Sequence, residues 1–80
     1  LKVLFFAQTR ELIGVDELSI EAEFTTADKL REHLAQKGDK WALALEKEKL
    51  LVAINQTLMP LESTVKSGDE IAFFPPVTGG

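Results

Sequence analysis

The chain ends in two adjacent glycines, and these are its most distinctive chemical feature. Gly79 and Gly80 follow Pro75 and Pro76 after only two further residues. Glycine has no Cβ, so a glycine tail can pass through a narrow active site. Adjacent prolines favour an extended, stiff backbone that projects the following residues away from the protein body. We therefore expect residues 75–80 to form a projecting tail, up to roughly 20 Å long at about 3.3 Å per residue, which offers the Gly80 carboxylate for reaction.

A free carboxylate must be activated before it can react, because its negative charge is delocalised over both oxygens. Attack on ATP gives an acyl adenylate and pyrophosphate, after which sulfur or an amine can displace AMP. The chain itself has no glycine-rich phosphate loop. We therefore expect a nucleotide-binding partner to use the ATP. Gly80 then becomes either a thiocarboxylate or an amide, and Gly79 provides steric clearance.

No other group of residues in the sequence indicates an active site. The single histidine, His33, is adjacent to Glu32 on a predicted helix, whereas a metal site needs three or four converging ligands. Asp28 and Glu32 lie four residues apart and are interpreted as a charged helix face. The serines have no histidine and acid arranged around them. We expect this chain to have no independent active site and to bind no metal or cofactor.

Composition restricts the class of protein further. The chain has 80 residues, of which 45% are hydrophobic, so it is long enough for one domain with its own core. It has no cysteine, which excludes disulfides and thiolate metal sites. Its net charge is −4 with no basic cluster, which disfavours nucleic acid. No apolar run is long enough to span a membrane, and the first residues lack a signal peptide. We expect a cytoplasmic protein.

Hydrophobic periodicity predicts five strands and two helices. Thr25 and Thr26 precede Asp28 in a helix-capping pattern, and Ala27 begins an apolar repeat at helical spacing. Asn55 tolerates a positive φ and predicts a tight turn with Gln56. Residues 8–14 are expected to be a connection with one helical turn over residues 10–13. The predicted strands cover residues 2–7, 18–22, 50–54, a short segment from Leu58 to Pro60, and 70–74; the predicted helices cover a segment from Ala27 that Gly38 closes, and residues 40–45.

The first and last strands carry the densest apolar runs, which is typical of central strands buried in a sheet. A long crossover separates them, so we expect them to pair in parallel. One main helix and a short second helix then cover a mixed sheet, which is economical for burying these faces. The sequence therefore predicts an α+β protein with the β-grasp arrangement of ubiquitin-like proteins. Residues 1–74 form this domain, and residues 75–80 form the tail.

One face of the predicted sheet is apolar although it points outward. Side chains alternate along a strand, and the charged residues Lys2 and Glu70 mark the solvent side of the first and last strands. Contiguous exposed apolar surface typically marks a binding site. We therefore expect a partner to dock on this side, close to the tail. The side chains on it are Leu4, Phe6, Ala72 and Phe74, extended by Leu58.

These segments together resemble a known family. Beyond the apolar first strand, the similarity includes Arg10-Glu11-Leu12 and extends over nearly the whole chain; its most specific part ends in Phe73-Phe74-Pro75-Pro76-Val77-Thr78-Gly79-Gly80. The chain resembles the small subunits of molybdopterin synthase, the ubiquitin-like sulfur carriers of molybdenum cofactor biosynthesis. The other matching segments are residues 2–7, 41–45, 52–56 and 68–72.

The resemblance implies a cycle of sulfur transfer. An adenylating enzyme of the ubiquitin-activating type charges Gly80 with ATP, and a sulfur donor converts the adenylate to a thiocarboxylate. The tail then enters the large subunit of the synthase and delivers sulfur to cyclic pyranopterin monophosphate. The family complex contains two small and two large subunits. The resemblance places partner contacts at Phe6, Arg10, Leu58, Phe74, Pro75, Pro76, Val77 and Thr78, with Arg10 facing the activating enzyme.

Three alternatives remain open from the sequence. A thiamin-pathway sulfur carrier also ends in two glycines on a β-grasp domain, although such chains tend to be shorter. A ubiquitin-like modifier joined to lysines can use the same tail. A noncovalent interaction domain with an inert tail belongs to a different class. Extension of the C-terminus by one residue separates the classes, because a carrier loses activity whereas an interaction domain keeps its binding.

Overall fold

The structure is a computed structural model that describes residues 1–21 and 25–76. Its sheet has five strands, as predicted. The second predicted strand is shorter than expected, and its last residue, Ala22, lies outside the described residues. In chain order the elements are β1 (Lys2–Phe5), α1 (Ala7–Ile13), β2 (Glu17–Ser19), α2 (Ala27–Ala35), α3 (Asp39–Ala44), the 3-10 helix η1 (Lys47–Lys49), β3 (Leu51–Ile54), β4 (Thr57–Met59) and β5 (Glu70–Phe74).

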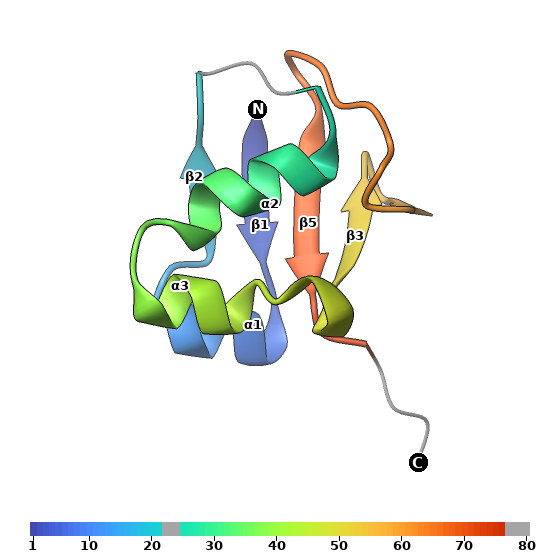
Figure 1. Cartoon of the computed structure of the whole chain (residues 1–80). Helices are drawn as coiled ribbons and strands as arrows, with labels where there is room; N and C mark the ends of the chain where they lie inside the picture. The colour runs from blue at the N-terminus through green and yellow to red at the C-terminus, as the bar shows by residue number, and fades with distance from the viewer. Residues whose placement is uncertain (22–24, 77–80) are drawn as a thin grey trace.

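The sheet places the first and last strands side by side at its centre. The strand order is β2-β1-β5-β3-β4, and Figure 1 shows β1 and β5 running in the same direction. Val3 pairs with Ile71 and Phe5 with Phe73 in this parallel ladder. The other neighbouring strands are antiparallel. The predicted parallel pairing of the two terminal strands is therefore confirmed.

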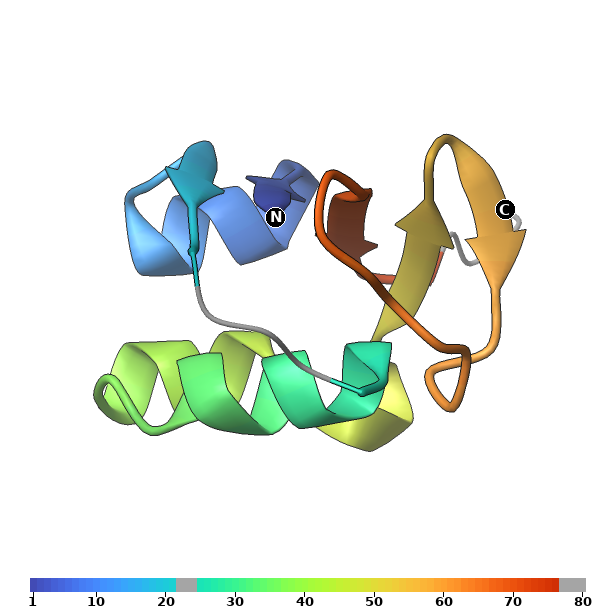
Figure 2. The ribbon, with the colours of Figure 1, turned by 90° about the horizontal axis from the view of Figure 1, so that it is seen from above.

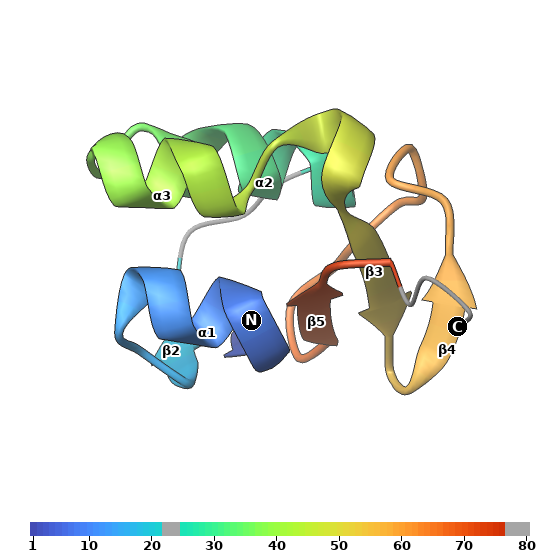
Figure 3. The ribbon, with the colours of Figure 1, turned by 90° about the horizontal axis from the view of Figure 1, so that it is seen from below.

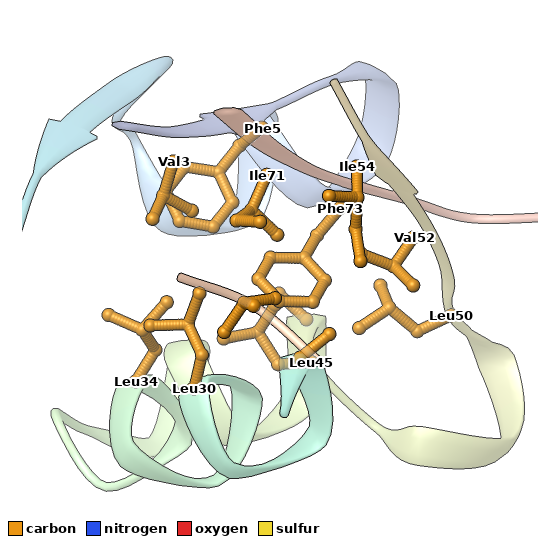
Figure 4. Packing of buried hydrophobic residues seen from close by; sticks show 13 residues of the cluster. Val3, Phe5, Leu30, Leu34, Leu45, Leu50, Val52, Ile54, Ile71 and Phe73 are labelled. Carbon is orange, nitrogen blue, oxygen red and sulfur yellow. The ribbon is translucent and has the colours of Figure 1, made fainter. Parts of the chain in front are cut away.

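Helices α2 and α3 form a second layer across one face of the sheet (Figure 2). Phe5 and Phe73 stack with ring centroids 6.4 Å apart, and Trp41 contacts Phe5 edge-on at 5.7 Å. Aromatic pairs in such geometries stabilise a core beyond the area that they bury. Figure 4 shows the apolar side chains of the sheet meeting those of the helices. Fully buried residues at this interface include Val3, Phe5, Leu30, Leu34, Leu45, Ile71 and Phe73.

Helix α2 begins where the capping pattern predicts. The Thr26 side chain accepts a hydrogen bond of 3.2 Å from the backbone N–H of Lys29, which satisfies one of the free donors of the first turn. Leu30 and Leu34 lie one turn apart and are both fully buried. The helix ends at Ala35 rather than continuing to Gly38, and Gly38 instead precedes α3.

The segment after β1 differs from the prediction. The strand ends at Phe5 instead of residue 7, and α1 is a full helix over Ala7–Ile13 rather than one turn. Gly14 ends this helix with a left-handed φ of 82°, and its N–H donates a 2.8 Å hydrogen bond to the Arg10 carbonyl. Glycine adopts this conformation without steric cost. The apolar run from residue 3 to residue 7 concealed the helix start, because apolar residues suit a strand and a helix equally well.

The hairpin between β3 and β4 is confirmed at residue level. Asn55 and Gln56 have φ values of 51° and 69°, as a two-residue hairpin with a primed turn requires. Leu58 lies opposite Ala53 in the resulting antiparallel pair. Within the described residues, no helix has the length and apolar character needed to cross a membrane.

Candidate functional site

Four strands contribute one apolar row to the face of the sheet that lies opposite α2 and α3. The strand registers align Leu4 with Ala72, Ala72 with Ala53, and Ala53 with Leu58. Residues directly opposite in neighbouring strands share a face. Leu4 and Leu58 therefore lie on one face with two small alanines between them. No helix of the described residues covers this face in Figures 2 and 3.

A second apolar row lies where β5 ends. Phe74 pairs with Leu51, and the N–H of Phe6 donates a 3.4 Å hydrogen bond to the Phe73 carbonyl. The opposite end of the same face is polar, because Lys2 pairs there with Glu70. The apolar part of the face is thus the part that adjoins the tail. We use the term docking face for Leu4, Phe6, Leu58 and Phe74, with Leu51, Ala53 and Ala72 between them.

The members of the docking face differ in exposure. Leu58 is 62% exposed and Phe6 is 45% exposed, whereas Leu4 and Phe74 are partly buried. Ala72 is only 9% exposed, so the expectation that it forms exposed surface is wrong. Its side chain is small and lies on a central strand with neighbours on both sides, so they cover it. Phe6 and Leu58 are therefore the most exposed side chains of this face.

The backbone at the start of α1 orients Phe6. Ala7 has a φ of 53°, a left-handed conformation that non-glycine residues rarely adopt. Phe6 is extended at the N-cap of the helix, and its carbonyl accepts a 3.4 Å hydrogen bond from the Arg10 N–H. The chain thus reverses directly after Phe6, which leaves the aromatic side chain on the docking face. Strained residues of this kind concentrate at functional sites.

Arg10 lies one helical turn after Phe6 and is exposed. Over residues 1–21 and 25–76, its guanidinium makes no hydrogen bond or ion pair. A partner with an acidic group could therefore bind it without displacing an internal contact. Its predicted role with an activating enzyme is compatible with this position and stays a prediction.

The described part of the tail begins beside the docking face. Pro75 is partly buried and Pro76 is exposed. Figures 1 and 3 both show residues 75–76 leading from the end of β5 toward the side of the sheet formed by β3 and β4. Val77, Thr78, Gly79 and Gly80 lie outside the described residues, so their roles and the division into domain and tail stay predictions.

A buried carboxylate fixes the start of β5 against the hairpin. Asn55 Nδ2 donates to Asp69 Oδ1 at 3.0 Å, and the Lys66 backbone N–H donates to Asp69 Oδ2 at 2.9 Å. Asn55 Oδ1 in turn accepts a 3.0 Å hydrogen bond from the Glu70 N–H. The hydrogen bonds from Asn55 and Lys66 stabilise the ionised form, which lowers the pKa of Asp69. Sequence reasoning missed this contact, because it recognised the turn but not the partner of Asn55.

Asp28 also has partners that the sequence did not indicate. Arg31 Nε donates to Asp28 Oδ1 at 2.8 Å and lowers the pKa of that carboxyl, with a further contribution from Lys47 at 3.4 Å. Arg31 Nη1 donates to the Leu45 carbonyl at 2.9 Å. Asp28 therefore connects α2 to the segment after α3 rather than forming a free charged face. His33 is exposed on α2, and the described residues contain no group of three or more possible metal ligands.

The fold and the docking face define the class of protein. A mixed sheet with its first and last strands parallel at the centre and helices across one face is the β-grasp fold of ubiquitin-like proteins, as predicted. A model of the ThiS family matches residues 3–80. The chain belongs to the ThiS family.

Individual relatives are similar over the full length of the chain. The molybdopterin synthase sulfur carrier subunit of Haemophilus influenzae is 82% identical, with the alignment covering 100% of this chain and 99% of that protein. The Escherichia coli protein of the same name is 58% identical over the same shares. A subunit in a solved complex of subunits 1 and 2 of molybdopterin-converting factor from Helicobacter pylori has a TM-score of 0.65 at 28% identity, covering 99% of this chain and 96% of that one.

Proposed function

We propose that this chain is the sulfur carrier of molybdopterin synthase and that the Gly80 carboxylate is its reactive group. The observation that carries the proposal is the apolar docking face. One of its residues, Phe74, ends β5 and is followed directly by Pro75 and Pro76. The names of the two relatives favour molybdopterin synthesis over the thiamin pathway. The names of these relatives also indicate that the chain acts as a sulfur-donating subunit of the enzyme rather than as an enzyme by itself.

The docking face binds the large subunit, which receives the tail. Phe6, Leu58 and Phe74 supply apolar contact area, and Pro75 and Pro76 direct the following residues into the partner. The solved Helicobacter pylori complex of subunits 1 and 2 supports a partner of this kind. Two small and two large subunits form the assembly. Arg10 contacts the adenylating enzyme, which uses the same region of the surface at a different step.

The chemistry takes place at one carbonyl carbon. The Gly80 carboxylate attacks the α-phosphate of ATP in the activating enzyme, forming the acyl adenylate and releasing pyrophosphate. A sulfur donor then displaces AMP and leaves a thiocarboxylate. In the large subunit this sulfur passes to cyclic pyranopterin monophosphate, and water cleaves the acyl–sulfur bond and supplies the oxygen that restores the Gly80 carboxylate. Gly79 and Gly80 keep the tail narrow enough to enter both partners. The chain binds no cofactor itself, and a cytoplasmic location remains our expectation.

The experiment that tests the proposal is the intact mass of the protein after incubation with ATP, the activating enzyme and a sulfur donor. We expect one oxygen-to-sulfur exchange, trapped by a thiol-alkylating reagent and mapped to Gly80. Oxidation of Met59 gives a nearly equal mass gain, so the site of the change must be mapped by fragmentation.

A Met59→Leu variant provides the matched control, because it removes the only methionine and retains the tail. Appearance of the free carboxylate alone, under conditions that charge the Escherichia coli relative, would contradict the carrier function. An amide bond between Gly80 and a lysine would instead indicate a protein modifier.

A further inference from the structure

The open edge of β4 presents unused backbone hydrogen-bonding groups at one residue. The N–H of Asn55 donates a 2.8 Å hydrogen bond to the Glu70 carbonyl. Bonded pairs alternate along an antiparallel ladder, so Ala53 also directs its backbone groups toward β5. Its opposite neighbour on β4 is Leu58, which therefore directs its own N–H and C=O away from β3. The two-residue hairpin leads to the same assignment. Ile54 and Thr57 flank the turn and form a hydrogen-bonded pair, so the next residue, Leu58, directs its backbone groups away from β3.

The other edge of the sheet has charges that β4 lacks. Glu17 on β2 lies 3.6 Å from the Lys2 ammonium in an ion pair. Charged residues on an edge strand oppose pairing with another strand. In contrast, residues 50–61 contain no charged residue in a chain that is 28% charged. The sequence thus protects the β2 edge and leaves the β4 edge open to a further strand.

A groove beside β4 has the position that an added strand needs. Its volume is about 480 Å³. Met59 pairs with Val52, which is buried in the layer between sheet and helices, and both residues line the groove, so the groove adjoins this layer at β3 and β4. Side chains alternate between the two faces of a strand. A strand added to β4 would place one side chain beside Leu58 and the next in this groove. The residues lining it are the apolar Leu50, Leu51, Val52, Met59, Pro60 and Leu61, together with the charged Lys47, Glu48 and Glu62.

We infer that the partner that receives the tail adds a β-strand to β4, pairing with the backbone of Leu58 and placing an apolar side chain in the groove. This inference rests on the proposed function, because it commits to the large subunit of molybdopterin synthase as the occupant. Two observations favour that occupant. The Leu58 side chain belongs to the docking face, and residues 75–76 lead toward the β3 and β4 side of the sheet (Figure 3).

The pairing is short and its register is fixed. Pro60 has no N–H, and its carbonyl already accepts a 3.0 Å hydrogen bond from the Ser63 N–H. Leu58 is therefore the residue of β4 that offers both a donor and an acceptor. Strand addition of this kind contributes main-chain hydrogen bonds, while the flanking pockets provide specificity.

Amide hydrogen exchange of the intact chain, alone and bound to purified large subunit, tests the inference. We expect the Leu58 N–H to exchange rapidly in the free chain and at least about tenfold more slowly in the complex. Ser19 provides the matched control, because the alternation in β2 directs its N–H to the other open edge. Its exchange rate should not change on binding.

A pair of variants separates the backbone from the side chain. Leu58→Ala removes the side chain, whereas Leu58→Pro also removes the N–H at an edge position where proline is tolerated. We expect Leu58→Pro to bind the large subunit about threefold to tenfold more weakly than Leu58→Ala. Circular dichroism checks that both variants fold. If Leu58→Pro does not fold, the exchange rate of the Leu58 N–H in the unmodified chain decides whether this backbone group pairs with the partner.

The outcomes distinguish this inference from the proposed function. Failure of the unmodified chain to bind the large subunit overturns the proposed function and the inference together. Formation of the complex with rapid Leu58 exchange overturns the inference alone and leaves docking through side chains. Protection of the Leu58 N–H in the isolated chain that increases with concentration also overturns it, because a second copy then occupies the edge.

Discussion

At the scale of single residues, Asn55 has two roles that depend on one backbone angle. Its positive φ of 51° makes the hairpin turn, and in this position its amide contacts both Asp69 and the Glu70 N–H. The hairpin that presents Leu58 is thereby attached to the strand that presents Phe74. The spacing between two members of the docking face thus depends on a polar contact outside it.

This contact makes a prediction for the pH dependence of stability. The pKa of Asp69 is lowered in the folded state by hydrogen bonds from Asn55 and Lys66. A depressed carboxyl pKa contributes stability above the unfolded value near 3.9, and this stability is lost as pH falls through the folded value. We expect the urea midpoint to be constant near neutral pH and to decrease below about pH 4.

The Asp69→Asn variant checks the origin of this decrease. It cannot titrate, so its urea midpoint should be lower than that of the unmodified chain at pH 7 but should change less on acidification. Asp28 has a lowered pKa as well and provides the comparison, since Asp28→Asn should retain the acid sensitivity due to Asp69. An equal slope for Asp69→Asn and the unmodified chain would contradict the assignment.

At the scale of elements, the two central strands create the functional end of the sheet. Phe6 follows β1 and Phe74 ends β5. Because these strands run in parallel, both aromatic residues lie at the same end of the sheet and on the same face. Leu58 joins them through β4 on the far side of β3. The docking face therefore depends on the order of four strands.

Substitution of Phe74 by aspartate tests the docking face. A charge placed beside Leu51 and Phe6 must be desolvated when the large subunit binds, so we expect Phe74→Asp to weaken binding by more than about 1 kcal/mol. Ser19→Asp adds the same charge at the polar end of the same side of the sheet and should change affinity little. Isothermal titration with the large subunit measures both, and equal affinities for the two variants would exclude this face as the interface.

The elements also show where sequence reasoning succeeds. The pairing of β1 with β5 could be predicted because both strands are dense in apolar residues and a long crossover joins them. The α1 helix could not, because its start depends on the left-handed Ala7, and no local pattern indicates such a residue. Burial of Ala72 was also missed, because alternation along a strand predicts the direction of a side chain but not how closely its neighbours cover it.

At the scale of the whole molecule, one rigid sheet connects recognition to chemistry. Phe74 of the docking face is followed directly by Pro75 and Pro76, so a partner bound to the face would receive the tail at a defined point. The placement of Phe6, Leu58 and Phe74 on one face of the sheet could be predicted from the sequence, whereas their role in binding stays a prediction. The open edge at Leu58 could not be predicted, because the pairing register between strands decides which residues of β4 form hydrogen bonds with β3.

Removal of Gly80 separates the two roles of the molecule. We expect deletion of Gly80 to abolish sulfur transfer, because the reactive carboxylate is displaced by one residue, whereas the urea midpoint and the affinity for the large subunit should be nearly unchanged. Gly80→Ala provides the matched control, since it retains the length and the carboxylate and should lose only part of the activity. Transfer by the deletion variant at the normal rate would exclude Gly80 as the carrier residue.

The pairing of β1 with β5 also has a consequence for when the docking face exists. Lys2 and Glu70 are register partners although nearly the whole chain separates them, and closing a loop of about 70 residues costs roughly 4 kcal/mol of chain entropy. Such long-range pairing forms late in folding, after the local helix and hairpin. Phe6 and Phe74 come together only at that step. A partner that recognises both residues would therefore bind only molecules in which the two terminal strands have already paired.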